Sequence, residues 1–161
     1  MSVFIFSKPI HSGKTTELQR WCDEQKSVAG ILMPDIDGVR YTRNIKTRET
    51  LIVECKDPSG TNEALVNIGR FHFYAAAFEK ANSVLLREAG PGNEWLIIDE
   101  IGRLEMEGKG FYPAVHAITQ TKAYKNLLLV VRDSLLEAVV SFFEIQDQRV
   151  IHSMDELPVN E

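Results

Sequence analysis

The stretch of sequence that decides the fold is VFIFSKPIHSGKTTELQRWC, residues 3–22. It opens with four consecutive apolar residues, Val3–Phe6, which predict a buried β-strand. A segment containing Ser, Pro and Gly follows, and apolar side chains then return at the helical spacing of Leu18, Trp21 and Cys22. The sequence therefore predicts a strand, a loop and a helix in succession, which is the setting of phosphate-binding loops.

The loop between this strand and helix contains the second half of the G-x-x-x-x-G-K-[ST] signature. Its residues are Lys8-Pro9-Ile10-His11-Ser12-Gly13-Lys14-Thr15, so Lys8 stands where the signature has its first glycine. Backbone N–H groups of such a loop, and the N-terminus of the following helix, bind phosphate oxygens. We expect Lys14 to reach the β- and γ-phosphates and the Thr15 hydroxyl to bind Mg²⁺. The predicted phosphate-binding residues are Pro9, Ile10, His11, Ser12, Gly13, Lys14, Thr15 and Thr16.

A second apolar strand, Trp95–Ile98, is followed directly by the acidic pair Asp99-Glu100. A phosphoryl-transfer site needs one carboxylate to hold Mg²⁺, usually through water, and a second group to orient or deprotonate the nucleophile. We assign Asp99 to the metal and Glu100 to the activation of the attacking water. An acidic pair after a strand is also a common start of a solvated loop, so this assignment depends on the phosphate loop.

Three polar features follow apolar strands: the loop before Gly13, the pair Asp99-Glu100, and Arg132 after Val131. In parallel sheets, ligands bind at the carboxyl ends of the strands, so we expect these features to share one edge. Arg132 is a candidate for stabilising charge on the transferring phosphoryl group, with Arg103 as the alternative. Both are equally explained as surface arginines or as partners of nearby carboxylates, such as Asp133 or Glu105.

The remaining chain alternates apolar strands with helices, which predicts an α/β fold: a mostly parallel sheet with helices on both faces. Further strands are expected at Gly30–Met33, Leu127–Val131 and Arg149–Ile151. Helices are expected at Ala75–Glu88 and Pro113–Thr121, and a third should start at Ser134, because Ser134 and Glu137 have capping-box spacing. Two alternating segments, Val39–Arg43 and Leu51–Cys55, predict an inserted antiparallel ribbon.

The segment between this ribbon and the helix at Ala75 contains fewer regular patterns. Asp57-Pro58-Ser59-Gly60 is a cluster of turn-forming residues. Further on, Phe71, Phe73 and Tyr74 form an aromatic cluster. We interpret this cluster as part of the core rather than as a contact to a nucleotide base.

Length and composition predict one domain, 1–161, in a cytoplasmic protein. The net charge of −5 argues against nucleic acid as the primary partner, because that affinity requires many cationic contacts to phosphates. Apolar runs such as Leu127–Val131 are far shorter than the roughly 20 residues of a membrane helix. The N-terminus shows no secretion signal, and Cys22 and Cys55 form neither a CxxC pair nor a zinc-ligand set. We therefore expect reduced thiols and no membrane partner.

The chain resembles the P-loop nucleoside-triphosphatases first described from thermophiles, a family with a cancer-related homologue in animals. Four stretches carry the resemblance: Ser12–Thr16, Gly30-Ile31, Gly69-Arg70-Phe71 and, most specifically, Ile98–Glu105. It implies a P-loop NTPase architecture and Mg²⁺-dependent hydrolysis of ATP, GTP and other nucleoside triphosphates to diphosphates, with loose base preference. The positions that match functional residues of the family are Lys14, Thr15, Asp99 and Glu100, whereas Lys8 and His11 replace glycines of its usual loop.

A second likeness leaves other functions open. The segment from Pro9 to Leu18 is similar to the loop of thymidine kinases of the zinc-bearing type, which also carry an Asp-Glu pair. Those enzymes require four zinc-binding cysteines, and this chain has two. A phosphotransferase acting on a nucleoside or another small molecule is therefore the first alternative. The second is a nucleotide-binding switch or scaffold with little turnover.

Overall fold

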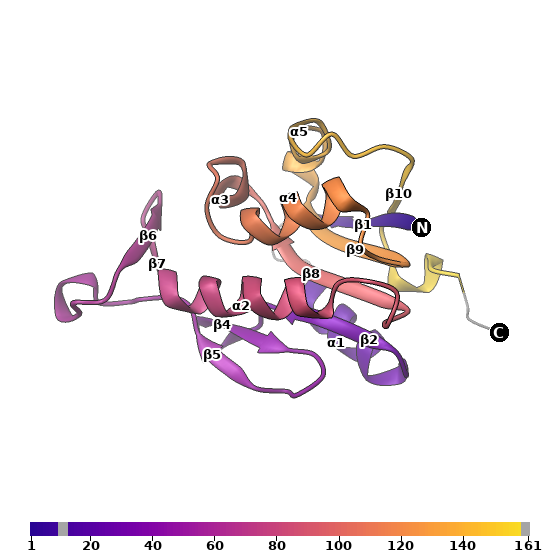
Figure 1. The fold of residues 1–161 in the computed structure, drawn as a ribbon. Helices are drawn as coiled ribbons and strands as arrows, with labels where there is room; N and C mark the ends of the chain where they lie inside the picture. The colour runs from indigo at the N-terminus through magenta and orange to yellow at the C-terminus, as the bar shows by residue number, and fades with distance from the viewer. Residues whose placement is uncertain (10–12, 159–161) are drawn as a thin grey trace.

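The main sheet has eight strands in the order β10-β1-β9-β8-β2-β4-β3, with β5 paired to β4 (Figure 1). The structure is a computed structural model that describes residues 1–9 and 13–158. The strands of this sheet are β1 (Ser2–Lys8), β2 (Val28–Leu32), β3 (Asp35–Ile36), β4 (Val39–Asn44), β5 (Thr50–Ile52), β8 (Trp95–Ile101), β9 (Asn126–Arg132) and β10 (Gln148–Ile151). The helices are α1 (Lys14–Glu24), α2 (Ala75–Glu88), α3 (Arg103–Met106), α4 (Tyr112–Thr121) and α5 (Leu136–Phe142).

Five strands, β10, β1, β9, β8 and β2, form the parallel part of the sheet. β1 pairs with β9 from Ser2 opposite Asn126 to Lys8 opposite Arg132. β8 pairs with β9 from the same end, with Trp95 opposite Asn126. The carboxyl ends of β1, β8 and β9 therefore meet at one edge of the sheet. The predicted α/β fold with a mostly parallel sheet is confirmed.

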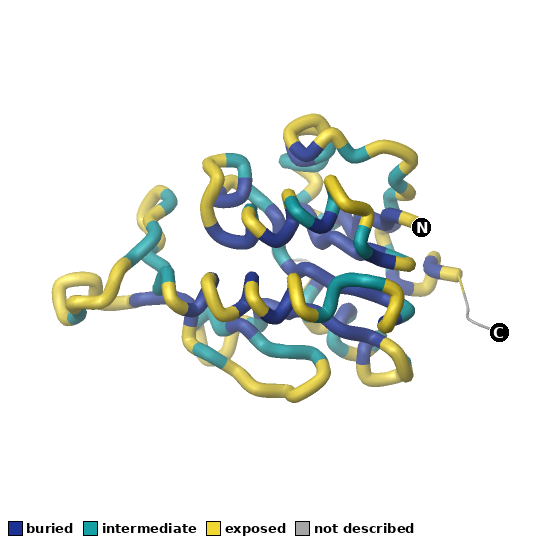
Figure 2. Tube along the Cα trace, in the orientation of Figure 1, coloured by how far each residue is buried: buried dark blue, intermediate teal, exposed yellow. Residues whose placement is uncertain are grey.

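Apolar side chains are buried on both faces of the sheet. In β1, Val3 and Ile5 belong to the core beneath α2, α4 and α5, while Phe4 and Phe6 belong to the core beneath α1. Figure 2 shows α2 and α4 with buried inner sides and exposed outer sides. The alternation along β1 therefore supplies both hydrophobic layers. Among the described helices, none is long and apolar enough to cross a membrane.

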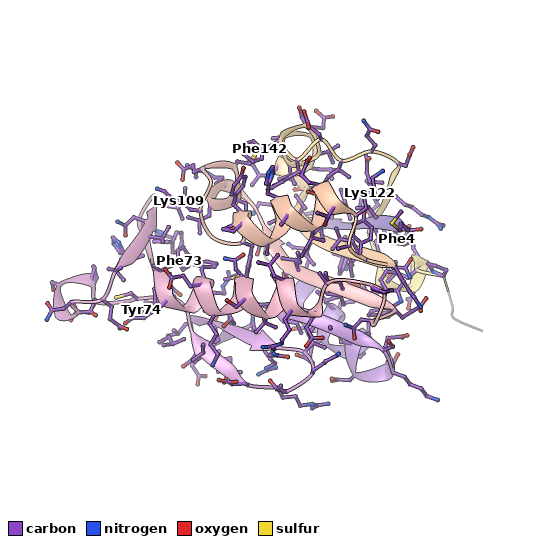
Figure 3. All side chains as sticks on the ribbon, viewed as in Figure 1. Phe4, Phe73, Tyr74, Lys109, Lys122 and Phe142 are labelled. Carbon is purple, nitrogen blue, oxygen red and sulfur yellow. The ribbon has the colours of Figure 1, made fainter. Side chains whose placement is uncertain are left out.

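A three-stranded antiparallel ribbon and a separate hairpin are added to this framework. β3, β4 and β5 extend the sheet beyond β2, which confirms the predicted ribbon. The separate hairpin, β6 (Leu65–Ile68) and β7 (Phe71–Tyr74), was not predicted. It projects from the body of the protein in Figure 1, and Figure 3 labels Phe73 and Tyr74 where it joins α2. An isolated bridge between Glu54, just after β5, and Phe73 of β7 connects the ribbon with this hairpin.

Several predicted boundaries differ from the structure, and two of these differences lie at β8 and at the start of α5. β8 continues to Ile101, because Asp99 and Ile101 still pair with residues of β9. The capping-box prediction at Ser134 is wrong. Asp133–Leu135 forms a 3₁₀ turn, α5 begins only at Leu136, and no side chain caps it. Ser134 therefore lies inside a turn, where its hydroxyl is not at the N-cap position.

Candidate active site

The loop residue Thr15 and the strand residue Asp99 are in direct contact, although 84 positions separate them. The Thr15 hydroxyl donates a hydrogen bond to Oδ2 of Asp99 at 3.1 Å. The backbone N–H of Met33, which follows β2, donates to the same oxygen at 3.1 Å. The first turn of α1 and the carboxyl ends of β8 and β2 thus converge on one carboxylate.

Asp99 is only 1% exposed. Burial raises its pKa to about 7, and the charge of Glu100 acts in the same direction, whereas the hydrogen bonds from Met33 and Thr15 lower it. A divalent cation would favour the ionised form, and hydroxyl and carboxylate oxygens suit Mg²⁺. Within residues 1–9 and 13–158, no cluster of three or more His, Cys, Asp or Glu side chains could hold a metal ion. A Mg²⁺ here would therefore share its coordination with phosphate and water oxygens.

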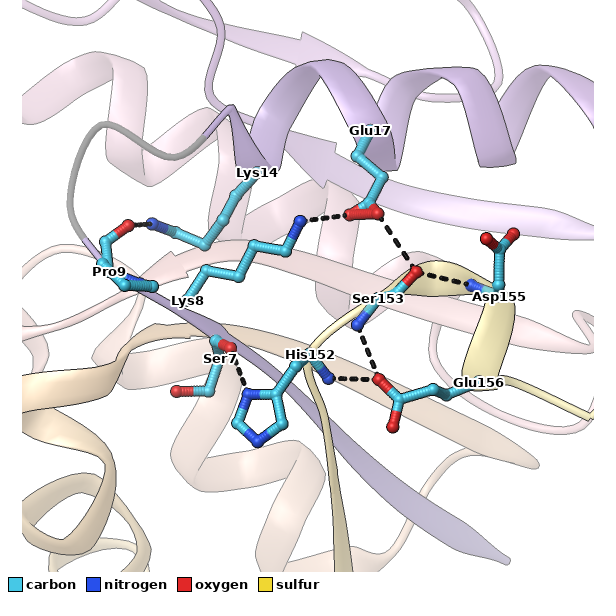
Figure 4. A network of polar contacts seen from close by, with 9 residues as sticks. All are labelled: Ser7, Lys8, Pro9, Lys14, Glu17, His152, Ser153, Asp155 and Glu156. Carbon is cyan, nitrogen blue, oxygen red and sulfur yellow. Dashed lines mark hydrogen bonds and ion pairs between the residues drawn. The ribbon is translucent and has the colours of Figure 1, made fainter.

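The described part of the loop directs its two lysines to different partners. Lys14 is buried, and its Nζ donates to the carbonyl oxygen of Pro9 at 3.2 Å, so it spans from the start of α1 to the start of the loop. Lys8 forms an ion pair with Glu17 of α1, with 2.9 Å between Nζ and Oε2 (Figure 4). Gly13 precedes α1 at φ 77°, a left-handed conformation that favours glycine. Three predicted phosphate-binding residues lie outside the described residues: Ile10, His11 and Ser12.

Glu100 lies between two arginines. Its Oε2 is 3.5 Å from Nη1 of Arg40 on β4, and its Oε1 is 3.7 Å from Nη2 of Arg132 at the end of β9. Arg132 therefore shares an edge with Glu100, as its position after Val131 suggested. Sequence reasoning missed Arg40, because nothing local connects it with a residue 60 positions away.

A cavity of about 560 Å³ opens beside Glu100. Arg103 lines it from the first turn of α3 and is exposed. Glu105 also lines it but is buried, and its carboxylate accepts hydrogen bonds from the N–H groups of Gly102 at 2.8 Å and Phe111 at 3.0 Å. Burial raises the pKa of Glu105 to about 7. Glu105 is thus held by backbone N–H groups, and no ion pair joins it to an arginine in the described chain.

The aromatic cluster is divided between the core and this cavity. Phe73 packs against the main core and also lines the cavity. Phe71 is 42% exposed and lines the same cavity, so its interpretation as a core residue is wrong. The reason is the unpredicted β6–β7 hairpin, which carries Phe71 away from the sheet. The two-residue Gly69-Arg70 turn was the sequence signal for that hairpin.

A phosphate loop between a strand and a helix, with its threonine bonded to a buried carboxylate of another strand, defines a P-loop nucleotide-binding protein. The model of the NTPase family matches residues 3–156, so the chain belongs to this family, and the predicted resemblance is confirmed. A similar solved structure is THEP1 from the hyperthermophile Aquifex aeolicus, with a TM-score of 0.70 and 20% identity over 96% of this chain and 91% of that chain. At that identity the likeness shows the fold alone. A search among curated proteins found no match.

Proposed function

We propose that this protein hydrolyses nucleoside triphosphates, including ATP and GTP, to diphosphate and phosphate in a Mg²⁺-dependent reaction. The observation that carries the proposal is the hydrogen bond between Thr15 of the loop and the buried carboxylate of Asp99. It brings two oxygens of a kind that suits Mg²⁺ to the N-terminus of α1, where triphosphate binds in proteins of this architecture. Membership of the NTPase family supports the reaction class.

The proposal assigns tasks to the residues of the site. The loop from Pro9 to Thr16 surrounds the phosphates, and Lys14 contacts the β- and γ-phosphates. Thr15 and Asp99 would hold Mg²⁺, which when bound neutralises charge on the phosphate oxygens. Arg132 balances the charge that develops on the γ-phosphoryl group, with Arg103 as the alternative.

Glu100 acts as the general base. Its carboxylate orients a water molecule and accepts a proton from it while the water oxygen attacks the γ-phosphorus. The bond from the γ-phosphorus to the β,γ-bridging oxygen breaks, and the nucleoside diphosphate leaves with that electron pair. Arg40 and Arg132 each contact a different oxygen of Glu100, at 3.5 and 3.7 Å, and orient its carboxylate.

The test measures phosphate release from ATP, GTP, CTP and UTP with Mg²⁺. Glu100→Gln keeps the side-chain shape but removes the base, so we expect kcat to fall by about 100-fold or more while nucleotide still binds. Lys14→Ala should lose nucleotide binding itself. Phosphate release from wild-type protein no greater than from Glu100→Gln would contradict the proposal. Binding without turnover would then favour the switch or scaffold alternative.

A further inference from the structure

The cavity beside Glu100 has the size of a small-molecule site. Its volume of about 560 Å³ falls within the roughly 300–1,000 Å³ typical of ligand pockets. The β3–β4 hairpin, the β6–β7 hairpin and the start of α3 contribute its walls. None of the described loop residues lines it, but Met33 and Glu100 do. It therefore adjoins the Thr15–Asp99 pair and is separate from the described residues of the phosphate loop.

Cationic side chains in this cavity outnumber the carboxylates that can neutralise them. Its cations are Arg40, Lys56, Arg70, Arg103 and Arg132, and its carboxylates are Asp35, Glu54, Glu100 and Glu105. Lys56 is paired with Glu54 at 3.0 Å, Arg40 and Arg132 are paired with Glu100, and Asp35 and Glu105 accept hydrogen bonds from backbone N–H groups. Within the described chain, Arg70 and Arg103 form no ion pair, and the buried Nε of Arg132 has no hydrogen-bond acceptor. These unused donors favour an anionic ligand.

The β6–β7 hairpin brings an exposed aromatic side chain to the cavity. Phe71 is 42% exposed, and its ring is nearly parallel to that of Phe73, with 6.4 Å between the centroids and 20° between the planes. The guanidinium of Arg70 lies 5.1 Å from the centre of the Phe71 ring. Flat aromatic and guanidinium surfaces of this kind bind a planar ring by stacking. The cavity thus offers a ring site and an anion site.

We infer that this cavity binds a second substrate, a ring-bearing small molecule with a phosphate group, which accepts the γ-phosphoryl group of the triphosphate. Nucleoside 5′-monophosphates have this chemistry. An oxygen of the acceptor phosphate attacks the γ-phosphorus, the bond to the β,γ-bridging oxygen breaks, and the nucleoside diphosphate leaves with that electron pair. A dianionic acceptor phosphate has no proton to lose in this step. The inference rests on the proposed triphosphate site and makes hydrolysis the reaction that occurs without an acceptor.

The experiment uses ATP with radioactive phosphorus in its γ-phosphoryl group and identifies the product that receives the label. The full chain is incubated with Mg²⁺ and this ATP, alone and with each nucleoside 5′-monophosphate, and the products are separated by thin-layer chromatography. We expect label in at least one nucleoside diphosphate. Nucleosides, which have a ring but no phosphate, should accept much less.

Two variants test whether the cavity binds the acceptor. Arg70→Ala should lower the ratio of transferred to released label by about tenfold, which corresponds to about 1.4 kcal/mol. Arg149→Ala removes an exposed arginine of β10 outside the cavity and should leave the ratio within about twofold. Because the ratio is measured within one sample, a partly unfolded variant does not change it.

The outcomes separate this inference from the proposed function. Label that enters only inorganic phosphate with every monophosphate would overturn the inference and leave the triphosphatase proposal intact. Preferred transfer to nucleosides, or an unchanged ratio in Arg70→Ala, would overturn the anionic acceptor site. Label that remains on ATP in every sample would contradict both proposals.

Discussion

Replacement of Asp99 with asparagine should make the metal-free protein more stable while it abolishes the nucleotide-dependent function. The carboxylate accepts both of its hydrogen bonds, from Thr15 and Met33, through Oδ2. The amide oxygen of asparagine has a similar position and can accept the same two hydrogen bonds. The substitution therefore removes the charge and keeps the contacts.

The magnitude follows from the pKa of Asp99, which burial raises from 3.8 to about 7. A group whose pKa is higher in the folded state contributes stability that is complete below the unfolded pKa and is lost as pH rises through the folded pKa. At about 1.4 kcal/mol per pH unit, ionisation of this 1% exposed side chain costs the folded wild-type protein up to about 4 kcal/mol at pH 8. Asparagine has no such cost.

Urea denaturation in the presence of EDTA measures this effect. At about pH 8, we expect Asp99→Asn to exceed the wild type in free energy of unfolding by up to about 4 kcal/mol. At about pH 4, where the wild-type carboxyl is protonated in the folded state, the two proteins should differ little. Addition of Mg²⁺ with a non-hydrolysable triphosphate should then stabilise the wild type but not the variant.

Two results would refute this reasoning. An equal stability difference at both pH values would show that the charge of Asp99 is not its cause. Equal stabilisation of both proteins by Mg²⁺ and nucleotide would exclude Asp99 as a metal ligand. Because denaturation is measured without turnover, neither result depends on the role of Glu100 as a general base.

Two further substitutions test the framework and the loop. In Gly30→Ala the new Cβ would overlap the carbonyl oxygen of Ile97, whereas Gly90, at a similar positive φ, has open space. Urea denaturation should show Gly30→Ala to be about 2 kcal/mol more destabilising than Gly90→Ala, and equal losses would contradict the clash. Lys8→Met should cost less than about 1 kcal/mol at low salt, because the pair with Glu17 is partly exposed. A loss that persists in 1 M NaCl would exclude an ionic cause.

The parallel framework could be predicted because its information is local. A buried strand is an apolar run, and an amphipathic helix has a period that its own residues show, so the predicted bounds of α2 match the structure. The meeting of Thr15 and Asp99 was also foreseeable, since parallel strands bring their carboxyl ends to one edge. Strand order was not needed for that conclusion.

The contact between Arg40 and Glu100 and the cavity beside it could not be predicted in the same way. Arg40 approaches Glu100 only because β4 pairs with β2 in antiparallel fashion, and this pairing depends on contacts distant in sequence. The cavity requires the β6–β7 hairpin in addition, whose strands have four residues each. Strands this short carry little periodic signal. Only the Gly69-Arg70 turn between them indicated a hairpin.

Lys8, which replaces the first glycine of the phosphate-loop signature, has a contact that a glycine could not make. Its ion pair with Glu17, 2.9 Å long, joins the end of β1 to the first turn of α1. The Ser153 hydroxyl donates to the other oxygen of Glu17 at 3.3 Å, and Nδ1 of His152 lies 2.8 Å from the carbonyl oxygen of Ser7 (Figure 4). The two sides of the loop are therefore tied to each other and to the segment after β10. The signature has a glycine here, which gives the backbone conformational freedom. This chain instead has a lysine side chain, whose ion pair with Glu17 connects the two ends of the loop.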